Sequence, residues 1–394
     1  MRRSAVGNLQ LAGGSLGKGP WVSLARTNSM ASSQRMFSTA SVDDLKPRLP
    51  RDSVKGELSF KFTRTDFMYV AETGRDQPWK EGKLLPYGPL SLEPAATVLS
   101  YGQGIFEGIK AFRTVKGRVV VFRPQENAKR FGEGAQRFMM PPVPEKVFMH
   151  AIDSIVKGNS DYIPEATKGS LYLRPLLFGS GGDLGVGPSS AYTFTIYASP
   201  VGNYFKDGPK KGIELLASTD VHRAAPKGSG WVKCIGNYAP CFAPQQKAKK
   251  EGFAEVLYLD AKHEKYVEEA GAANVFCVTA DGTLYTPSLE GSILPGVTRK
   301  SIIQLARDRG YKVEEKRLPI EVMCNAAEAF CSGTGASITP IGGITYQGKR
   351  HAIGDGTIGK ITKELYEALL DVQLERAEDK HGWLHDPYAA ATSR

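Results

Sequence analysis

The chain has 394 residues, 41% of them hydrophobic and 23% charged, which is typical of a folded protein of two or three domains and argues against general disorder. Its five cysteines form no CxxC pair and its six histidines are scattered, so we expect neither a disulfide framework nor a metal site. The net charge of +10 comes without a Lys/Arg run interleaved with aromatic residues, and no apolar run has membrane-spanning length, so we expect no nucleic-acid or membrane partner.

Much of the positive charge lies in the first 42 residues, which contain no acidic residue. Five basic residues stand there: Arg2, Arg3, Lys18, Arg26 and Arg35. Acid-poor N-termini rich in Arg and Ser are typical of organellar transit peptides. We therefore predict a transit peptide over residues 1–37, cleaved after Phe37, and a location in the mitochondrial matrix. A plastid address and a simple disordered basic tail are the alternatives.

The first half of the folded chain mixes helices and strands. We predict a polar lead over residues 38–57 and a smaller α+β domain over 58–203, because apolar residues there recur at helical and strand spacing. The predicted elements are a buried strand at Val119–Phe122, helices at Glu126–Phe138 and Glu145–Val156, and β-rich runs at Ser170–Phe178 and Tyr192–Ser199.

Turn-forming residues separate the two halves. We predict an interdomain linker over residues 204–212, a larger domain over 213–386 and a tail over 387–394. The larger domain is predicted to contain strands at Ile213–Ser218, Glu255–Leu259, Asn274–Thr279 and Glu328–Cys331, and helices at Gln245–Lys250, Thr298–Asp308 and Ile358–Leu374. There is no internal repeat and no regular βαβ alternation, so the predicted fold class is α+β.

One lysine, Lys233, stands alone among apolar and small residues, with no other charge between Lys227 and Lys247. Poor solvation of its ammonium lowers its pKa and makes the neutral amine available as a nucleophile, the environment that a Schiff-base lysine needs. The alternative is a structural lysine whose head group reaches solvent while its stem packs.

Other segments offer partners for a phosphorylated aldehyde. Glu269 lies at the start of an apolar strand, where a carboxylate could pair with a protonated ring nitrogen or could simply be solvated. Val297 and Thr298 open a predicted helix, and Thr334 and Gly335 lie in a small-residue turn. Both loops could bind phosphate, as well as serve as a cap or a turn. Arg130 could supply the neutralising charge.

Arg174 is a charge inside the apolar strand 170–178 and needs an acidic partner. That partner could be a carboxylate of the protein or one of a substrate. The sequence leaves these two possibilities open.

Taken in order, several segments resemble the fold type IV pyridoxal-phosphate enzymes, and most closely the branched-chain amino acid aminotransferases of plant organelles. The resemblance runs from about Phe60 to Leu374. The segments that carry it are Tyr101–Ala111, Leu171–Phe178, His222–Pro226, Val232–Tyr238, Leu257–Asp260 and Ile293–Arg299. The resemblance implies a two-domain fold like that of D-amino acid aminotransferase, with pyridoxal 5'-phosphate as cofactor.

The resemblance also implies roles for individual residues. Lys233 matches the lysine that holds the cofactor covalently and moves the substrate proton. Glu269 matches the acid that faces the pyridine nitrogen, and Tyr238 matches the phenol at O3'. The phosphate would be bound by Arg130, Val297, Thr298 and Thr334.

The substrate site follows from the same resemblance. Tyr101, Thr334 and Gly335 match positions near the α-carboxylate, while Arg174 matches the arginine that meets the distal carboxylate of 2-oxoglutarate. The wall around the substrate side chain is matched by Phe60, Phe106, Tyr172, Val186 and Tyr204. Phe62 competes with Phe60 for its place. The residue matching Val186 comes from the partner subunit in this family, so the resemblance implies a homodimer.

The predicted activity is reversible transfer of the amino group of L-leucine, L-isoleucine or L-valine to 2-oxoglutarate. A D-amino acid aminotransferase or an aminodeoxychorismate lyase of the same fold is the enzymatic alternative. A catalytically silent binding protein is the alternative of another class. Arg174 and the segment Tyr101–Ala111 argue against the first alternative, and the presence of Lys233, Glu269 and Arg130 argues against the second. Departures such as Ala272-Ala273 leave the preference among the three amino acids open.

Overall fold

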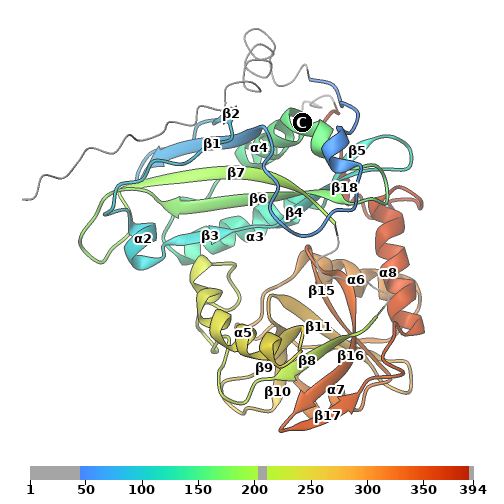
Figure 1. Ribbon diagram of the computed structural model, residues 1–394. Coiled ribbons are helices and arrows are strands. Elements are labelled where there is room, and N and C mark those ends of the chain that lie inside the picture. Colours follow the sequence, from blue (N-terminus) through green and yellow to red (C-terminus); the bar gives the residue numbers. More distant parts are fainter. Residues whose placement is uncertain (1–44, 203–210, 390–394) are drawn as a thin grey trace, which may run out of the picture. The chain divides into compact units, whose positions relative to one another are not determined.

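The computed structural model describes residues 45–202 and 211–389. The predicted transit peptide over 1–37, Tyr204 and nearly all of the predicted linker lie outside the described residues. The described residues belong to one compact unit, Ser41–Arg394, built around two β-sheets (Figure 1).

The first sheet is antiparallel and has the strand order β18-β5-β4-β6-β7-β1-β2, with β3 paired to β6. Its strands are β1 (Phe67–Gly74), β2 (Lys83–Pro86), β3 (Gly104–Phe106), β4 (Ile109–Arg113), β5 (Val119–Phe122), β6 (Ser170–Gly179), β7 (Ala191–Val201) and β18 (Leu384–His385). The helices of this part are α2 (Thr97–Tyr101), α3 (Pro124–Arg137) and α4 (Glu145–Gly158). The predicted strand at 119–122 and both predicted helices are confirmed, with ends that differ by at most two residues.

Helices α3 and α4 pack on one face of this sheet because their apolar residues recur every three or four positions. Phe131 of α3 and Phe148 of α4 contact Phe194 of β7 in the resulting core. Part of the segment predicted as a polar lead also packs here. Val54 is fully buried, and the guanidinium of Arg51 pairs with the carboxylate of Asp161.

The second sheet contains a closed ring of strands. Its members pair in the order β8-β9-β10-β11-β15-β16, and β16 returns to pair with β8. The strands are β8 (Ile213–Ala217), β9 (Glu255–Leu259), β10 (Tyr266–Ala270), β11 (Ala273–Val278), β12 (Leu284–Thr286), β13 (Val313–Glu315), β14 (Leu318–Pro319), β15 (Glu328–Gly333), β16 (Ser337–Tyr346) and β17 (Lys349–Ala352). The helices are α5 (Phe242–Lys250), α6 (Val297–Asp308), α7 (Ile320–Cys324) and α8 (Lys360–Gln373).

The strands and helices predicted for this half are present. The structure adds strands β10, β12, β13, β14, β16 and β17 and the short helix α7. Glu269 does not begin the apolar strand that follows it. It lies on β10, and the apolar strand is its hairpin partner β11. Strand β16 was not predicted because its two central glycines interrupt the apolar run.

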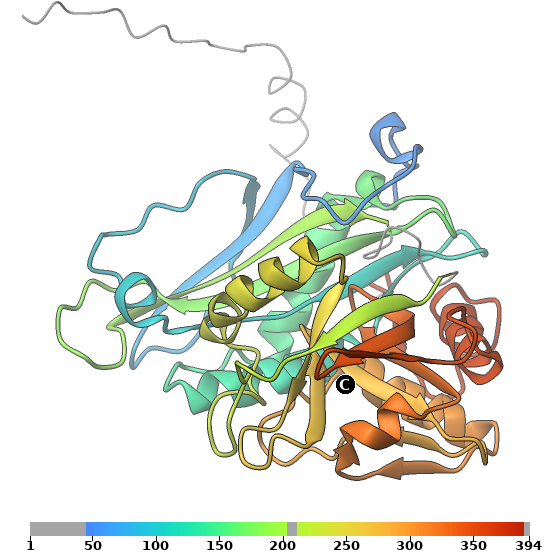
Figure 2. The ribbon, with the colours of Figure 1, turned by 60° about the horizontal axis from the view of Figure 1, so that its bottom comes forward.

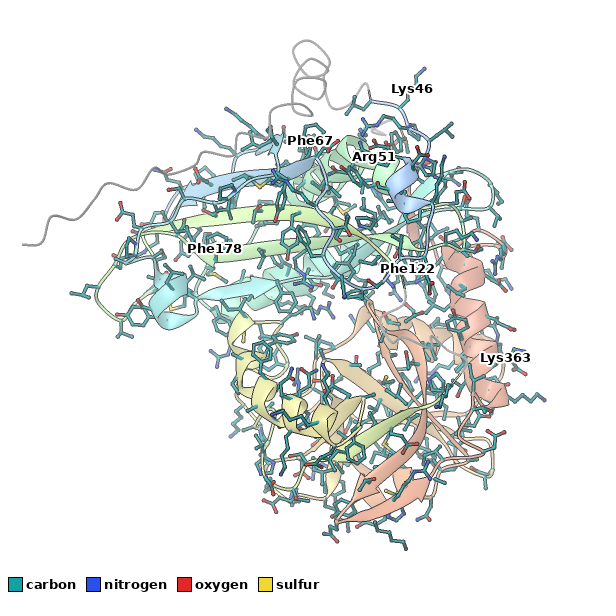
Figure 3. The ribbon with its side chains drawn as sticks, in the orientation of Figure 1. Lys46, Arg51, Phe67, Phe122, Phe178 and Lys363 are labelled. Carbon is teal, nitrogen blue, oxygen red and sulfur yellow. The ribbon has the colours of Figure 1, made fainter. Side chains whose placement is uncertain are left out.

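A shared apolar cluster joins the two sheets. Phe112 and Phe122 of the first sheet pack with Phe276 and Phe330 of the second and with apolar residues of α6 and α8. Phe122 is labelled in Figure 3. Figure 2 shows α5 from another side, together with the strands of the second sheet. The common core fixes the loops that extend from both sheets toward one cavity.

Candidate active site

A cavity of about 460 Å³ lies where the two sheets meet. Its wall is formed by β6, by the segment around Lys233, by the start of α6 and by the turn that follows β15. Apolar and aromatic side chains predominate, with a few charged groups among them, as is usual for small-molecule sites. Eleven predicted site residues line it: Phe60, Phe106, Arg130, Tyr172, Arg174, Lys233, Tyr238, Val297, Thr298, Thr334 and Gly335. Glu269 lies directly behind the wall, where its neighbour Ala270 and its hydrogen-bond partner Asn274 line the cavity.

Lys233 extends its amine into this cavity. Its backbone is held against β3, because the Lys233 carbonyl accepts a hydrogen bond from the Phe106 N–H at 3.0 Å. The Nζ atom donates to the Tyr238 hydroxyl at 3.1 Å and lies 4.5 Å from the centre of the Phe106 ring. Burial, assisted by the positive charge of Arg130, lowers the pKa of Lys233 to about 8. The alternative of a lysine that reaches solvent is therefore wrong.

Glu269 is buried on β10, with 1% of its surface exposed. Its Oε1 accepts from Asn274 Nδ2 at 3.2 Å, and its Oε2 lies 2.6 Å from Nη1 of Arg223. Burial raises the pKa of Glu269 to about 7, while the charge of Arg223 opposes that rise. The alternative of a solvated hairpin acid is wrong for this residue.

Two small-residue loops meet at one end of the cavity. Val297 and Thr298 are the first residues of α6, whose first N–H groups have no partner within the helix. Thr334 and Gly335 lie in the turn between β15 and β16. Ser332 lies beside this turn, and its hydroxyl is buried without a hydrogen-bond partner among the described residues. Together these groups present N–H and hydroxyl donors that could hold an anion, and we call them the donor cup.

Arg130 completes the donor cup from α3. Its Nε and Nη2 donate to the two carboxylate oxygens of Glu107, both at 2.7 Å, and its Nη1 donates to the carbonyl of Pro295 at 2.9 Å. A guanidinium has five N–H donors, so two remain for an anion in the cavity. Glu107 is fully buried and also accepts from Asn127 Nδ2 at 2.8 Å. The ion pair therefore fixes the direction of the Arg130 fork.

Strand β6 forms the opposite wall. Its side chains alternate, so Leu171 and Leu173 enter the core while Tyr172, Arg174 and Leu176 face the cavity. Gly108 is required beside this strand, because a Cβ there would lie 2.0 Å from the Tyr172 hydroxyl.

Arg174 has no carboxylate within 4 Å among the described residues. Its guanidinium lies 4.7 Å from the ring centre of Phe106 and 5.3 Å from that of Tyr172. Phe60 packs edge-on against Tyr172 at 5.2 Å, whereas Phe62 is exposed outside the cavity, so Phe60 is the residue of the wall. The wall thus combines aromatic surface with one cation that lacks an acidic partner.

Comparison with known proteins identifies the family. Residues 104–344 match the model of the family described as amino-transferase class IV. The chloroplastic branched-chain-amino-acid aminotransferase 5 of Arabidopsis thaliana is 45% identical over 327 residues, which are 83% of this chain and 78% of that relative. The chain belongs to the class IV aminotransferases, in the branched-chain aminotransferase family.

Other relatives of this aminotransferase differ in name. A methionine aminotransferase of Arabidopsis thaliana is also 45% identical over 327 residues, 83% of this chain and 91% of that one. The branched-chain aminotransferases among the relatives include some named chloroplastic and others named mitochondrial. A branched-chain amino acid aminotransferase of Escherichia coli has a similar structure, with a TM-score of 0.71 and 30% identity over 82% of this chain and all of that one. The fold type IV prediction is thereby confirmed.

A second solved branched-chain amino acid aminotransferase holds pyridoxamine 5'-phosphate. It has a TM-score of 0.70 and 30% identity, covering 82% of this chain and 99% of that one. Another structure of the same protein holds N-(5'-phosphopyridoxyl)-L-glutamate, with a TM-score of 0.68 and 28% identity over the same shares. At least one solved member of the family therefore binds forms of the pyridoxal-phosphate cofactor.

Two predicted residues of the aminotransferase are not brought to the cavity. Tyr101 is 41% exposed, and its hydroxyl donates to the carbonyl of Leu184. Val186 lies on the same loop and is 91% exposed. The described part of one chain therefore closes the cavity without them.

Three charged residues were missed by the sequence analysis: Glu107, Arg223 and Lys110. The Nζ of Lys110 is buried and donates to the Gly335 carbonyl at 3.3 Å, and burial lowers its pKa to about 8. Glu107 and Lys110 stand in one apolar, glycine-rich segment, but they lie three residues apart and Arg113 follows, so they lack the isolation that identified Lys233. No helix in the described ranges is long and apolar enough to cross a membrane. Within those ranges no cluster of three or more metal-ligating side chains occurs.

Proposed function

We propose that this chain is a branched-chain amino acid aminotransferase, which exchanges an amino group between L-leucine, L-isoleucine or L-valine and 2-oxoglutarate. The observation that carries the proposal is Arg174. Its half-buried guanidinium has no acidic partner among the described residues, and it lies in an otherwise aromatic and apolar wall. Such a wall accepts an aliphatic side chain in one half-reaction and the distal carboxylate of a dicarboxylate in the other.

The residues present fit pyridoxal 5'-phosphate as cofactor. The donor cup of Val297, Thr298 and Thr334, with the free donors of Arg130, suits a phosphate, and Ser332 offers a buried hydroxyl that no protein group occupies among the described residues. Glu269 would face the ring nitrogen, and Tyr238 the phenolic oxygen. When bound, the cofactor supplies an electron sink for the pair of electrons released at the substrate Cα.

Lys233 would be both the attachment point and the proton carrier. A pKa of about 8 leaves a sizeable share of the amine neutral at physiological pH, so it can act as a nucleophile and then accept a proton from Cα. The Tyr238 hydroxyl, 3.1 Å away, orients the amine, and the Phe106 ring limits access of water. Burial keeps Tyr238 protonated by raising its pKa.

Methionine is the second candidate donor, because the methionine aminotransferase of Arabidopsis thaliana is as similar as the branched-chain enzyme. Its unbranched thioether chain would contact the same Phe60 and Tyr172 rings. A D-amino acid aminotransferase or a lyase is less well supported, since Arg174 fits a dicarboxylate acceptor.

The test is a comparison of kcat/KM for leucine, isoleucine, valine, methionine and D-alanine with 2-oxoglutarate as acceptor. The proposal predicts that at least one of the three branched donors exceeds methionine and that D-alanine is inactive. A preference for methionine would assign the second function instead. Activity with D-alanine alone would overturn both.

We further propose a homodimer in the mitochondrial matrix. Leu184 and Val186 are more than 90% exposed on one loop, and large apolar side chains on a surface favour contact with another protein surface. Light scattering of the purified chain should give twice the chain mass.

The proposed location is tested separately. Residues 1–37 fused to a fluorescent protein should enter mitochondria, and entry into plastids would assign the other compartment.

A further inference from the structure

Arg223 contacts the carboxylate that faces the cofactor side of the cavity. Its side chain is almost completely buried, its Nη1 lies 2.6 Å from Glu269 Oε2, and its Nε donates to the Gly271 carbonyl at 3.2 Å. The segment His222–Pro226 stood out in the sequence, but no role followed for it. The structure places its arginine directly behind Glu269.

A β-bulge places a second carboxylate in the same neighbourhood. Along the β9–β10 pair, Val267 is opposite Leu259 and Glu269 is opposite Tyr258, so Glu268 is an extra residue in the ladder. A bulge interrupts strand alternation and redirects side chains. Glu268 is 4% exposed, and the residue that contacts it, Ser292, also contacts Arg223, because the Ser292 carbonyl accepts from Arg223 Nη1 at 3.4 Å. Ser292 donates a hydrogen bond to Glu268 Oε1.

The cluster of Glu268, Glu269 and Arg223 contains two buried carboxylates and one guanidinium. Burying an unbalanced charge is costly, so this cluster favours a ligand that brings one positive charge. Glu269 Oε2 is occupied by Arg223 and, at 3.4 Å, by the N–H of Leu294. Oε1 accepts from Asn274 and has capacity for one more donor.

We propose that Arg223 is a positioning residue for Glu269 and that Glu268 supplies the counter-charge for Arg223, so that the site selects a cofactor ring with a protonated nitrogen. The inference rests on the proposed function, since it presumes that pyridoxal phosphate binds here. Without Arg223, the uncompensated negative charge of Glu268 makes the neighbouring Glu269 carboxyl hold its proton, so that it stops accepting one from the ring. Without Glu268, Arg223 and Glu269 neutralise each other and the ring nitrogen loses its counter-charge.

The test compares two ligands on the apoenzyme, pyridoxal phosphate and its 1-deaza analogue, which has a CH group in place of the ring nitrogen. Their dissociation constants at pH 7.5 are measured by quenching of tryptophan fluorescence. The wild-type chain should prefer pyridoxal phosphate, and Arg223→Gln and Glu268→Gln should each reduce that preference about tenfold, the equivalent of one pKa unit. The double variant should recover most of it, because one carboxylate then meets one ring cation.

The outcomes distinguish a failure of the proposed function from a failure of the roles proposed for Arg223 and Glu268. If the wild-type chain binds neither ligand, the proposed function fails. If it prefers pyridoxal phosphate and both single variants keep that preference, or if both ligands weaken equally, Arg223 and Glu268 are merely structural and the inference is overturned. Arg317→Gln, which breaks an exposed pair with Glu290, is the control and should leave the preference unchanged. Should Arg223→Gln fail to fold, Arg223→Lys and Glu268→Gln decide the question.

Discussion

The arginines on the proposed cofactor side of the cavity and on its proposed substrate side have different partners. On the cofactor side, Arg130 and Arg223 are each paired with a buried glutamate. On the substrate side, Arg174 has aromatic neighbours and the Tyr172 hydroxyl at 3.4 Å, and no carboxylate among the described residues. Paired arginines keep a fixed orientation, which suits a group that stays bound through many turnovers. An arginine without a carboxylate partner suits a charge that arrives and leaves with each substrate.

The largest effect is expected at the residue shared by both sides. Lys233→Ala removes the nucleophile and the proton carrier, so transamination should fall at least about 10³-fold. The thermal midpoint should change little, because the alanine leaves no charge buried. Near-normal turnover in this variant would contradict the assignment of Lys233.

The next test breaks a pair on the cofactor side. Glu107→Gln leaves Arg130 buried without its counter-charge, which should lower the free energy of unfolding by about 3 kcal/mol. It should also weaken retention of pyridoxal phosphate. Urea unfolding measures the first effect and dialysis followed by absorbance measures the second.

The chain offers a matched control for that pair. Arg350 and Glu214 form a similar two-point contact at 2.7 and 3.0 Å on the surface. Glu214→Gln should therefore leave stability nearly unchanged. Equal losses in the two variants would show that burial of the Arg130–Glu107 pair has no special consequence.

A change on the substrate side should separate the two half-reactions. Arg174→Met removes the cation but keeps apolar volume, so kcat/KM for glutamate should fall about 10- to 100-fold, the value of one charge-assisted hydrogen bond. The leucine half-reaction should change less than about threefold on the same grounds. Single-turnover absorbance measurements of each half-reaction provide the comparison. An equal loss for both substrates would mean that Arg174 supports the fold rather than the acceptor.

The smallest expected effect is a pH profile. With a pKa of about 8, half of the Lys233 amine is neutral at about pH 8, and nearly all of it is neutral one pH unit higher. Attachment of pyridoxal phosphate to the apoenzyme should therefore accelerate about tenfold per pH unit below 8 and level off above it. A rate that still rises between pH 9 and 10 would indicate a lysine of ordinary pKa.

The sequence predicted single groups better than pairs of groups. Lys233, Arg174 and Glu269 could be singled out because a charge in an apolar segment is visible without a structure. The buried ion pairs could not be predicted, since Glu107 lies 23 positions before its partner Arg130 and Arg223 lies 46 before its partner Glu269, and only the fold brings the partners together. The bulge at Glu268 depends on the pairing of two strands and has no local signal.

For the fold, too, local features were predicted better than contacts between distant segments. Helices α3, α4 and α6 follow from apolar periodicity, and their predicted ends are accurate to within two residues. The closed ring of β8, β9, β10, β11, β15 and β16 depends on pairing between distant strands, which periodicity does not contain. Tyr101 and Val186 are the exceptions among the described residues that were predicted for the site, because they lie outside the cavity that one chain forms.

The most direct test of the central claim is an absorbance titration of the pyridoxal-phosphate-loaded protein, first with L-leucine and then with 2-oxoglutarate. We predict that leucine converts the visible cofactor band to the pyridoxamine form and that 2-oxoglutarate restores it, because one cavity serves both substrates. A visible band that changes only when D-alanine is added, or the absence of such a band after pyridoxal phosphate is added, would contradict this account.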